Sequence, residues 1–146
     1  MPRLLLALAV PVILTLGNLV ARAAEPADAS LRAKPARYGS VIGLRAEKLE
    51  EYKRLHAAVW PAVAKMITTV NIRNYSIYLR KLPDGNYYLF SYFEYVGRDF
   101  AADMAKMAAD PNTKKWWELC DPCQKPLTDR KKGEWWASMQ EVFHQD

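Results

Sequence analysis

The sequence predicts an α+β domain in which a four-stranded antiparallel sheet carries two main helices on one face. Short runs rich in β-branched and aromatic residues, typical of strands, occur at four places after residue 37. Two segments between these runs repeat apolar residues at three- and four-residue steps, as amphipathic helices do. A Pro-Asp-Gly-Asn turn at residues 83–86 joins the middle two runs as a hairpin.

Residues 1–23 have the layout of a secretory signal peptide. Arg3 supplies a positive charge, residues 4–21 are uncharged, and Ala21-Arg22-Ala23 has small residues at the positions that a signal peptidase reads. A permanent membrane anchor is the alternative, but this stretch is at the lower limit of spanning length. We therefore expect cleavage, no stable membrane insertion, and an exported protein, periplasmic or secreted. Residues 24–36 lack apolar periodicity and are expected to form a disordered leader before a domain at 37–146.

The first half of the domain is expected to hold two strands and one long helix. Residues 38–44 are short, partly β-branched and bounded by polar sequence, which favours a strand. From Glu47 to Val70 apolar residues form one helical stripe. Pro61 lies inside that stripe and should kink or split the helix, because proline lacks the N–H and clashes with the preceding turn. Residues 71–82 alternate as a second strand.

The second half is expected to add two strands and a second helix. The expected elements are a strand at 87–96, a helix at 98–109, one or two helical turns at 113–119, an irregular loop at 120–134 and a last strand at 137–144. The order strand, helix, strand, strand, helix, strand is that of a ferredoxin-like βαββαβ fold, which places both helices on one face of the sheet.

The other face of this sheet should not remain in water. The strand at 87–96 has bulky residues on both faces, with Tyr87, Leu89 and Phe93 on one and Tyr88 and Phe90 on the other. Exposed apolar surface costs roughly 25 cal/mol per Å². We therefore expect a homodimer in which a second copy packs sheet against sheet, although the loop at 120–134 folding beneath the sheet is an alternative.

Charge and cysteine content exclude several classes of function. The net charge is +5 and the basic residues are scattered, which gives no reason to expect nucleic-acid binding. Two cysteines and two histidines are too few for a structural zinc site without carboxylates, so we expect no metal. Cys120 and Cys123 form one C-x-x-C motif. In an exported protein a disulfide is the simplest interpretation, and a thioredoxin-like redox role is disfavoured because Pro122 interrupts the motif.

His56 is the candidate proton carrier. It falls on the apolar stripe of the first helix, with Tyr52 one turn before it and Trp60 one turn after it. Histidine has an unperturbed pKa near 6.5 and exchanges protons readily at neutral pH. The alternative is a histidine that simply packs at the edge of the core.

Trp116 and Trp117 form the second candidate feature. Adjacent helical residues point to different sides, so both are not expected in the core. Exposed indoles stack on sugar rings and donate their N–H groups to hydroxyls. Alternatively, one indole covers the core and the other joins the dimer interface.

Four motifs in register resemble the L-rhamnose mutarotase family. They are Tyr52-Lys-Arg-Leu-His56 followed by Trp60-Pro61, Asn74-Tyr75-x-Ile77-Tyr78-Leu79, Lys115-Trp116-Trp117, and Met139-Gln140-Glu141-Val142-Phe143. The resemblance covers residues 37–144. It implies a dimeric α/β barrel of ferredoxin-like protomers, with His56 as the proton donor and Tyr52, Tyr75, Trp116 and Trp117 as contacts to a monosaccharide.

The resemblance also implies the chemistry, which is interconversion of the α and β anomers of L-rhamnose or a related deoxysugar. Such a reaction opens and recloses a hemiacetal by general acid–base catalysis, so no cofactor is expected. Two alternatives are a non-catalytic sugar-binding module, and a cofactor-independent monooxygenase or haem-binding protein of the same architecture. Two departures are notable: relatives are cytoplasmic, and the segment at 120–132 differs from the usual loop after the double tryptophan.

Overall fold

The computed structural model describes residues 34–145, so the proposed signal peptide and most of the proposed leader lie outside the described residues. The elements are β1 (Ala36–Leu44), α1 (Leu49–Ala57), α2 (Pro61–Thr69), β2 (Ile72–Lys81), β3 (Tyr87–Tyr95), α3 (Phe100–Ala109), α4 (Pro111–Cys120), β4 (Gln124–Lys125) and β5 (Ala137–Met139). Short 3-10 turns lie at Ala46–Lys48 and Asp121–Cys123.

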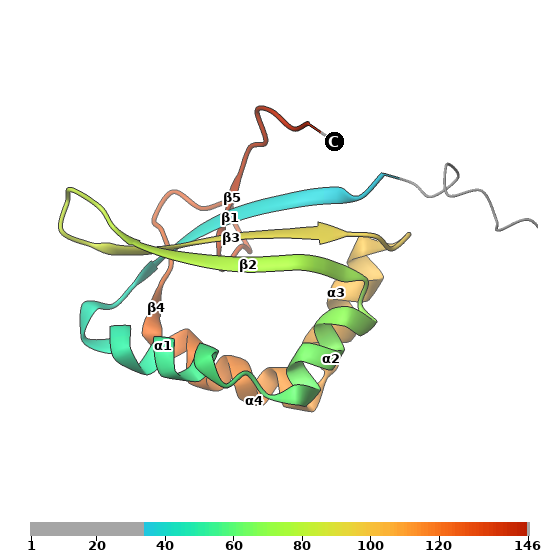
Figure 1. Ribbon diagram of the computed structural model, residues 1–146, viewed down its shortest axis with the longest axis horizontal. Helices are drawn as coiled ribbons and strands as arrows, with labels where there is room; N and C mark the ends of the chain where they lie inside the picture. Colours follow the sequence, from blue (N-terminus) through green and yellow to red (C-terminus); the bar gives the residue numbers. More distant parts are fainter. Residues whose placement is uncertain (1–33, 146) are drawn as a thin grey trace, which may run out of the picture. The chain divides into compact units, whose positions relative to one another are not determined.

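The strands form one antiparallel sheet in the order β2-β3-β1. The far side of β1 is covered by two short strands: β5 pairs with Gly39–Val41, and β4 pairs with Gly43–Leu44. The four helices lie on one side of the curved sheet (Figure 1). The expected α+β class, with an antiparallel sheet and its helices on a single face, is therefore confirmed in outline.

The long helix expected from residue 47 is split at its proline. α1 ends at Ala57, and Ala58 has a non-helical φ of −140°. α2 then starts with Pro61 in its first turn, where a proline needs no N–H partner. The break changes the direction of the chain between α1 and α2. Both helices nevertheless keep apolar residues toward the sheet.

α4 is longer than the one or two turns that the sequence indicates. Its N-cap is Asp110, whose Oδ2 accepts hydrogen bonds from the backbone N–H of Thr113 at 2.7 Å and from its hydroxyl at 2.9 Å. Pro111 occupies the first turn, as in α2. A capping acid followed by proline starts a helix effectively, and α4 continues for ten residues to Cys120.

A bulge in β2 decides which of its side chains face the helices. The register against β3 shifts between Arg73 and Ser76, and Asn74 has a φ of 50°, in the left-handed region. One extra residue reverses the alternation of faces. As a result Ile72 and Ile77, five positions apart, both face the helices.

The core lies between the sheet and the helices. Its most deeply buried members are Ile42 and Leu89, which are 0% and 1% exposed, together with Val70 and Cys123. Cys120 is also buried, and both cysteines are free thiols. The expected disulfide is thus not present, because both side chains pack separately as small apolar groups in this core.

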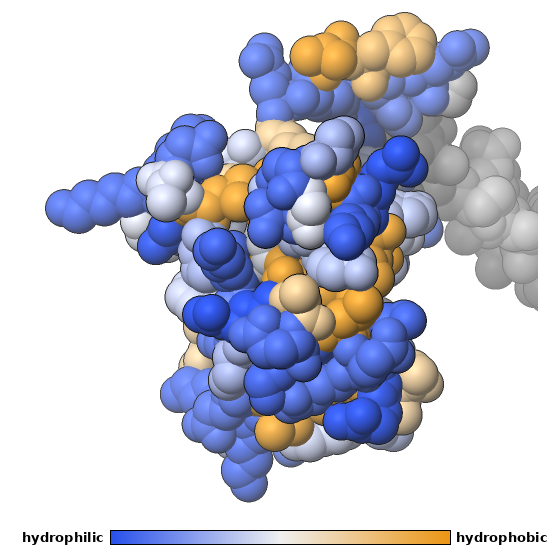
Figure 2. Space-filling view, turned by 90° about the vertical axis from the view of Figure 1, so that its left-hand side faces the viewer, coloured by the Kyte–Doolittle hydropathy of each residue, from blue (hydrophilic) through white to orange (hydrophobic). Residues whose placement is uncertain are grey.

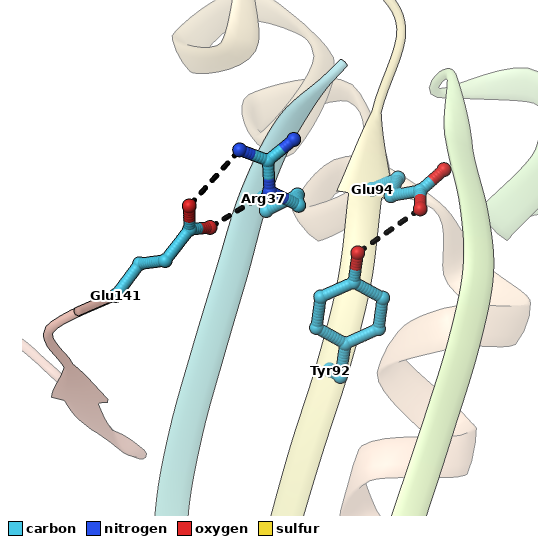
Figure 3. A network of polar contacts seen from close by, with 4 residues as sticks. All are labelled: Arg37, Tyr92, Glu94 and Glu141. Carbon is cyan, nitrogen blue, oxygen red and sulfur yellow. Dashed lines mark hydrogen bonds and ion pairs between the residues drawn. The ribbon is translucent and has the colours of Figure 1, made fainter. Parts of the chain in front are cut away.

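The C-terminal strand is shorter than expected. β5 ends at Met139, and the residues after it leave the sheet. Arg37 of β1 holds this tail through a two-pronged ion pair with Glu141, at 2.8 and 2.9 Å (Figure 3). The bidentate geometry fixes where the tail departs from the sheet.

The face of the sheet that has no helices carries exposed apolar groups. Val142 and Phe143 are 89% and 77% exposed, Tyr78 is 64% exposed and Met139 is 42% exposed. Figure 2 shows apolar side chains at the top of the domain, at the height where Figure 1 places the C-terminal segment. This side of the domain therefore holds the apolar surface for which the sequence predicts a partner.

Candidate functional site

A cavity of about 290 Å³ lies between the sheet and α1. α1 contributes Tyr52, Lys53, His56 and Ala57, while the strands contribute Ile77, Leu79 and Leu89. The sheet side of the cavity is entirely apolar and the polar groups come from one helix face. Such a site can place an imidazole and a phenol against one side of a small ligand.

His56 is half-buried and packed between two aromatic rings. It stacks on Tyr52 with ring centroids 4.1 Å apart, and its edge meets Trp116 at 5.5 Å. Its Nδ1 lies 3.1 Å from the backbone carbonyl oxygen of Tyr52. A carbonyl only accepts hydrogen bonds, so Nδ1 carries the proton and the neutral imidazole has its lone pair at Nε2.

The charge state of His56 follows from its surroundings. Burial lowers the pKa of its imidazole below 6.5, and the hydrogen bond to the Tyr52 carbonyl opposes this shift only in part. The imidazole is therefore mainly neutral at pH 7. A neutral imidazole with a bare Nε2 is a proton acceptor, and after accepting a proton it becomes a donor.

The two tryptophans of α4 face different sides, as expected. Trp116 is buried, 6% exposed, and its ring meets both His56 and Trp60, the latter at 5.4 Å. Trp117 is 38% exposed and makes no ring contact with this group among residues 34–145. The structure thus brings Trp116 to the imidazole and leaves Trp117 on the outer side of the helix.

Two phenols converge near the end of α4. Tyr52 is 4% exposed, and burial raises the pKa of its phenol strongly, with further contributions from Tyr75 and Cys120. Burial also raises the pKa of Tyr75 to about 12, and Cys120 adds to this effect. Tyr75 as a whole is 43% exposed. Both phenols remain protonated at neutral pH and can donate hydrogen bonds.

Sequence reasoning missed two polar neighbours of Tyr52. Cys120 lies one turn after Trp116 on α4 and shares its face, a spacing that the sequence already contained. Gln124 lies in the segment expected to be an irregular loop, yet it is 5% exposed and belongs to β4. No periodicity surrounds Gln124, so only the three-dimensional structure identifies it.

The described part of the chain contains no cluster of three or more histidine, cysteine or acidic side chains placed to hold a metal ion. Among residues 34–145, no helix combines the length and the apolar character needed to cross a bilayer.

The chain is similar to L-rhamnose mutarotases. The family model for L-rhamnose mutarotase matches residues 37–145. The L-rhamnose mutarotase of Lactiplantibacillus plantarum is 32% identical over 110 residues, which cover 75% of this chain and 98% of that protein. The Bacillus subtilis protein of the same name is 29% identical with the same coverage. The crystal structure of an L-rhamnose mutarotase from Formosa agariphila matches the fold with a TM-score of 0.58 at 20% identity, covering 76% of this chain and 99% of that one.

The prediction that the protein is exported, periplasmic or secreted, is wrong. The bacterial L-rhamnose mutarotases that the chain matches are cytoplasmic enzymes of sugar catabolism. The prediction depended only on the composition of residues 1–23, which lie outside the described residues. An uncharged apolar stretch at the N-terminus has the composition of a signal peptide whether or not it acts as one.

The matched region includes the described sheet except for Ala36 at the start of β1, helices α1 to α4, and the cavity beside His56. The family model and the curated relatives agree on the family, and the solved structure agrees on the fold. The chain belongs to the L-rhamnose mutarotase family.

Proposed function

We propose that this protein interconverts the α and β anomers of L-rhamnose or a related deoxysugar in the cavity beside α1, as an isomerase of the L-rhamnose 1-epimerase type. The observation that carries the proposal is the neutral imidazole of His56, whose Nδ1 is held by the Tyr52 carbonyl and whose Nε2 is left for a substrate. The family membership favours this function over a haem-binding or monooxygenase barrel.

The proton balance of the reaction suits a single imidazole. Ring opening removes a proton from the anomeric hydroxyl and adds one to the ring oxygen, and both oxygens are bonded to the same carbon. Nε2 of His56 accepts the first proton and, as imidazolium, returns it to the ring oxygen. In the open-chain aldehyde, rotation about the bond between the carbonyl carbon and its neighbour turns the other face of the carbonyl toward the hydroxyl. Ring closure with the two proton transfers reversed then gives the other anomer. The proton donor that the resemblance implies is, in this scheme, the imidazolium formed within the cycle.

The neighbouring side chains hold the sugar in this proposal. Tyr52 and Tyr75 supply protonated phenols that donate to sugar oxygens. The apolar floor of Ile77 and Leu79 suits the less polar face of a deoxysugar. Trp116 fixes the ring of His56 by its edge contact. Trp117 is proposed as a sugar contact on the strength of the resemblance alone.

We also propose that the protein is a homodimer of ferredoxin-like protomers that pair through their open sheet faces into an α/β barrel. Support comes from the exposed Tyr78, Met139, Val142 and Phe143 on that side of the domain. Closed twofold pairing is the commonest way to cover such a face. Sedimentation should give twice the chain mass, and Phe143→Asp should weaken the pairing. A monomeric wild-type protein would contradict this assembly.

The activity is tested with freshly dissolved α-L-rhamnose. Saturation-transfer NMR measures the rate of exchange between the anomeric proton signals with and without the protein. The expected result is exchange faster than in buffer, which His56→Ala abolishes. Exchange at the buffer rate, with sugar binding intact, would instead indicate a non-catalytic binding module.

A further inference from the structure

The bulge in β2 determines the side of the sheet on which Tyr75 lies. At this point β2 has two residues, Asn74 and Tyr75, opposite the single residue Phe93 of β3. The pairing with β3 is regular before and after these two residues. Without the extra residue, Tyr75 would take the place of Ser76 opposite Tyr92, and its side chain would point to the other face of the sheet.

Tyr75 lies on the face that the helices cover. Its ring meets the ring of Phe93 edge to face, with centroids 5.7 Å apart. The ring of Phe93 is parallel to that of Phe100, the first residue of α3, and Tyr38 stacks on both, at 5.0 and 4.5 Å. The bulge thus places Tyr75 on the same side of the sheet as α1 and its His56 (Figure 1). Tyr75 is 43% exposed, so a ligand can reach it from solvent.

The backbone of Asn74 has the unusual conformation that this bulge requires. Its φ of 50° is in the left-handed region, which most residues with a Cβ adopt only at a cost. Asparagine adopts it more easily because its short amide can form hydrogen bonds nearby. Here the amide Nδ2 donates to Oε2 of Glu94 at 2.7 Å. A carboxylate acceptor makes such a bond stronger than a neutral acceptor does.

The carboxylate of Glu94 is itself held in place. Its second oxygen, Oε1, accepts a hydrogen bond from the hydroxyl of Tyr92 at 3.0 Å (Figure 3). Both residues belong to β3, which is paired with β1 on one side and with β2 on the other. Both also point to the face without helices, since Phe93 between them points to the helices. The carboxylate is therefore a fixed point of the sheet to which the side chain of Asn74 is tied.

We propose that Glu94 is a positioning residue that holds the amide of Asn74, stabilises the bulge and thereby keeps Tyr75 on the side where the sugar binds. The proposal rests on the proposed function, because Tyr75 is a sugar contact only within that function. Glu94 acts from the opposite face of the sheet and does not touch the sugar. One strand residue thus transmits its effect through the backbone of its neighbour.

The first test measures KM and kcat for anomer exchange in Glu94→Met, which keeps the length of the side chain and removes both acceptor oxygens. KM should rise about 10-fold, the equivalent of one hydrogen bond lost from the sugar, while kcat stays close to the wild-type value because His56 is unchanged. Glu94→Gln keeps one acceptor for Asn74 and should restore most of the affinity.

The matched control is Glu141→Met. Glu141 is the other carboxylate of Figure 3, and its ion pair with Arg37 does not involve β2. The same substitution there should leave KM unchanged. Saturation-transfer NMR at a series of L-rhamnose concentrations gives KM and kcat for each variant. An equal rise of KM in both methionine variants would overturn the proposal.

A double-mutant cycle tests whether Glu94 acts through Asn74. Glycine adopts a positive φ without help from a side chain, so Asn74→Gly should keep the bulge and the wild-type KM. In this background Glu94→Met should have no further effect on KM. Equal losses in both backgrounds would show that Glu94 acts in some other way. If methionine at position 94 prevents folding, Glu94→Thr, which suits a strand, replaces it in the cycle.

A spectroscopic measurement without sugar separates this proposal from the proposed function. The nuclear Overhauser effect between the ring protons of Tyr75 and Phe93 should be present in the wild type, in Glu141→Met and in Asn74→Gly, and weak or absent in Glu94→Met. Wild-type protein that does not accelerate exchange would refute the proposed function, while loss of this signal would still establish the control of Tyr75 by Glu94. An unchanged signal in Glu94→Met, with an active wild type, would refute the positioning role alone.

Discussion

Replacing His56 by alanine should abolish the catalysis while leaving the fold intact. The imidazole supplies the only unengaged Nε2 beside the cavity among the described residues. General acid–base catalysis is worth about 10²–10⁴-fold. The exchange rate due to the enzyme should fall by this factor, which corresponds to about 3–5 kcal/mol of transition-state stabilisation.

The effect on stability should be smaller. His56 is half-buried and makes two ring contacts, with Tyr52 and Trp116. Losing such contacts costs about 0.5–1.5 kcal/mol each. The total is below the 5–15 kcal/mol that is typical of a folded domain. The variant should therefore fold, and its loss of activity can be assigned to the chemistry.

The pH dependence gives an independent check of the same residue. Because burial lowers the pKa of His56 below 6.5, the neutral base predominates at pH 7. The value of kcat/KM should be constant above pH 7 and should decrease as the pH falls through that lowered pKa. Saturation-transfer NMR at a series of pH values, corrected for the buffer rate, measures it.

His144→Ala is the control, since it removes the other histidine of the chain from an exposed position. It should keep the wild-type rate and the wild-type pH profile. Wild-type activity in His56→Ala, or a rate that rises as His56 is protonated, would refute the assignment of a neutral base.

Three further outcomes are expected. Trp116→Ala should lower the free energy of unfolding by about 3–5 kcal/mol because the indole is buried, whereas Trp117→Ala should change it by less than about 1 kcal/mol; urea denaturation compares the two. Asn74 has a φ of 50°, in the left-handed region that alanine adopts only at a cost. Asn74→Ala should therefore destabilise the fold by about 1 kcal/mol and displace Tyr75, whereas Asn74→Gly should keep the bulge. Thermal unfolding measures the loss of stability, and sugar affinity reports the displacement of Tyr75. The folded protein binds a proton at His56 less readily than the unfolded chain does, so the free energy of unfolding should decrease as the pH falls below about 6.5. Urea denaturation at several pH values measures this decrease, which should be smaller in His56→Ala.

Local patterns predict the secondary structure where an element carries its own signal in the sequence. The turn at residues 83–86 and the alternation on either side of it predict the hairpin of β2 and β3 correctly. Pro61 correctly predicts a break in the first helix. The end of β5 at Met139 was not predictable, since the apolar residues after it look like a strand although Val142 and Phe143 are exposed and outside any strand.

The candidate site could be predicted only where residues share one element. The helical spacing of Tyr52 and His56 places both on one face of α1, and the structure shows their rings stacked. Gln124 is a different case, because its position depends on pairing between β4 and β1, which are far apart in the sequence. Helix geometry predicts that Trp116 and Trp117 point to different sides of α4. Which of the two indoles faces His56 depends on how α4 packs against α1 and the sheet.

The edge of β1 is divided between two short strands, and this leaves room for variation within the family. Residues 126–136 depart from the sheet after β4 and return to it at β5. Insertions or deletions in the first part of this loop can alter its length without shifting the pairing of β1 with β3. Changes near Trp135 are different, since its indole reaches Gln124. Substrate preference could thus diverge by remodelling one end of a single surface loop while the rest of the sheet stays unchanged.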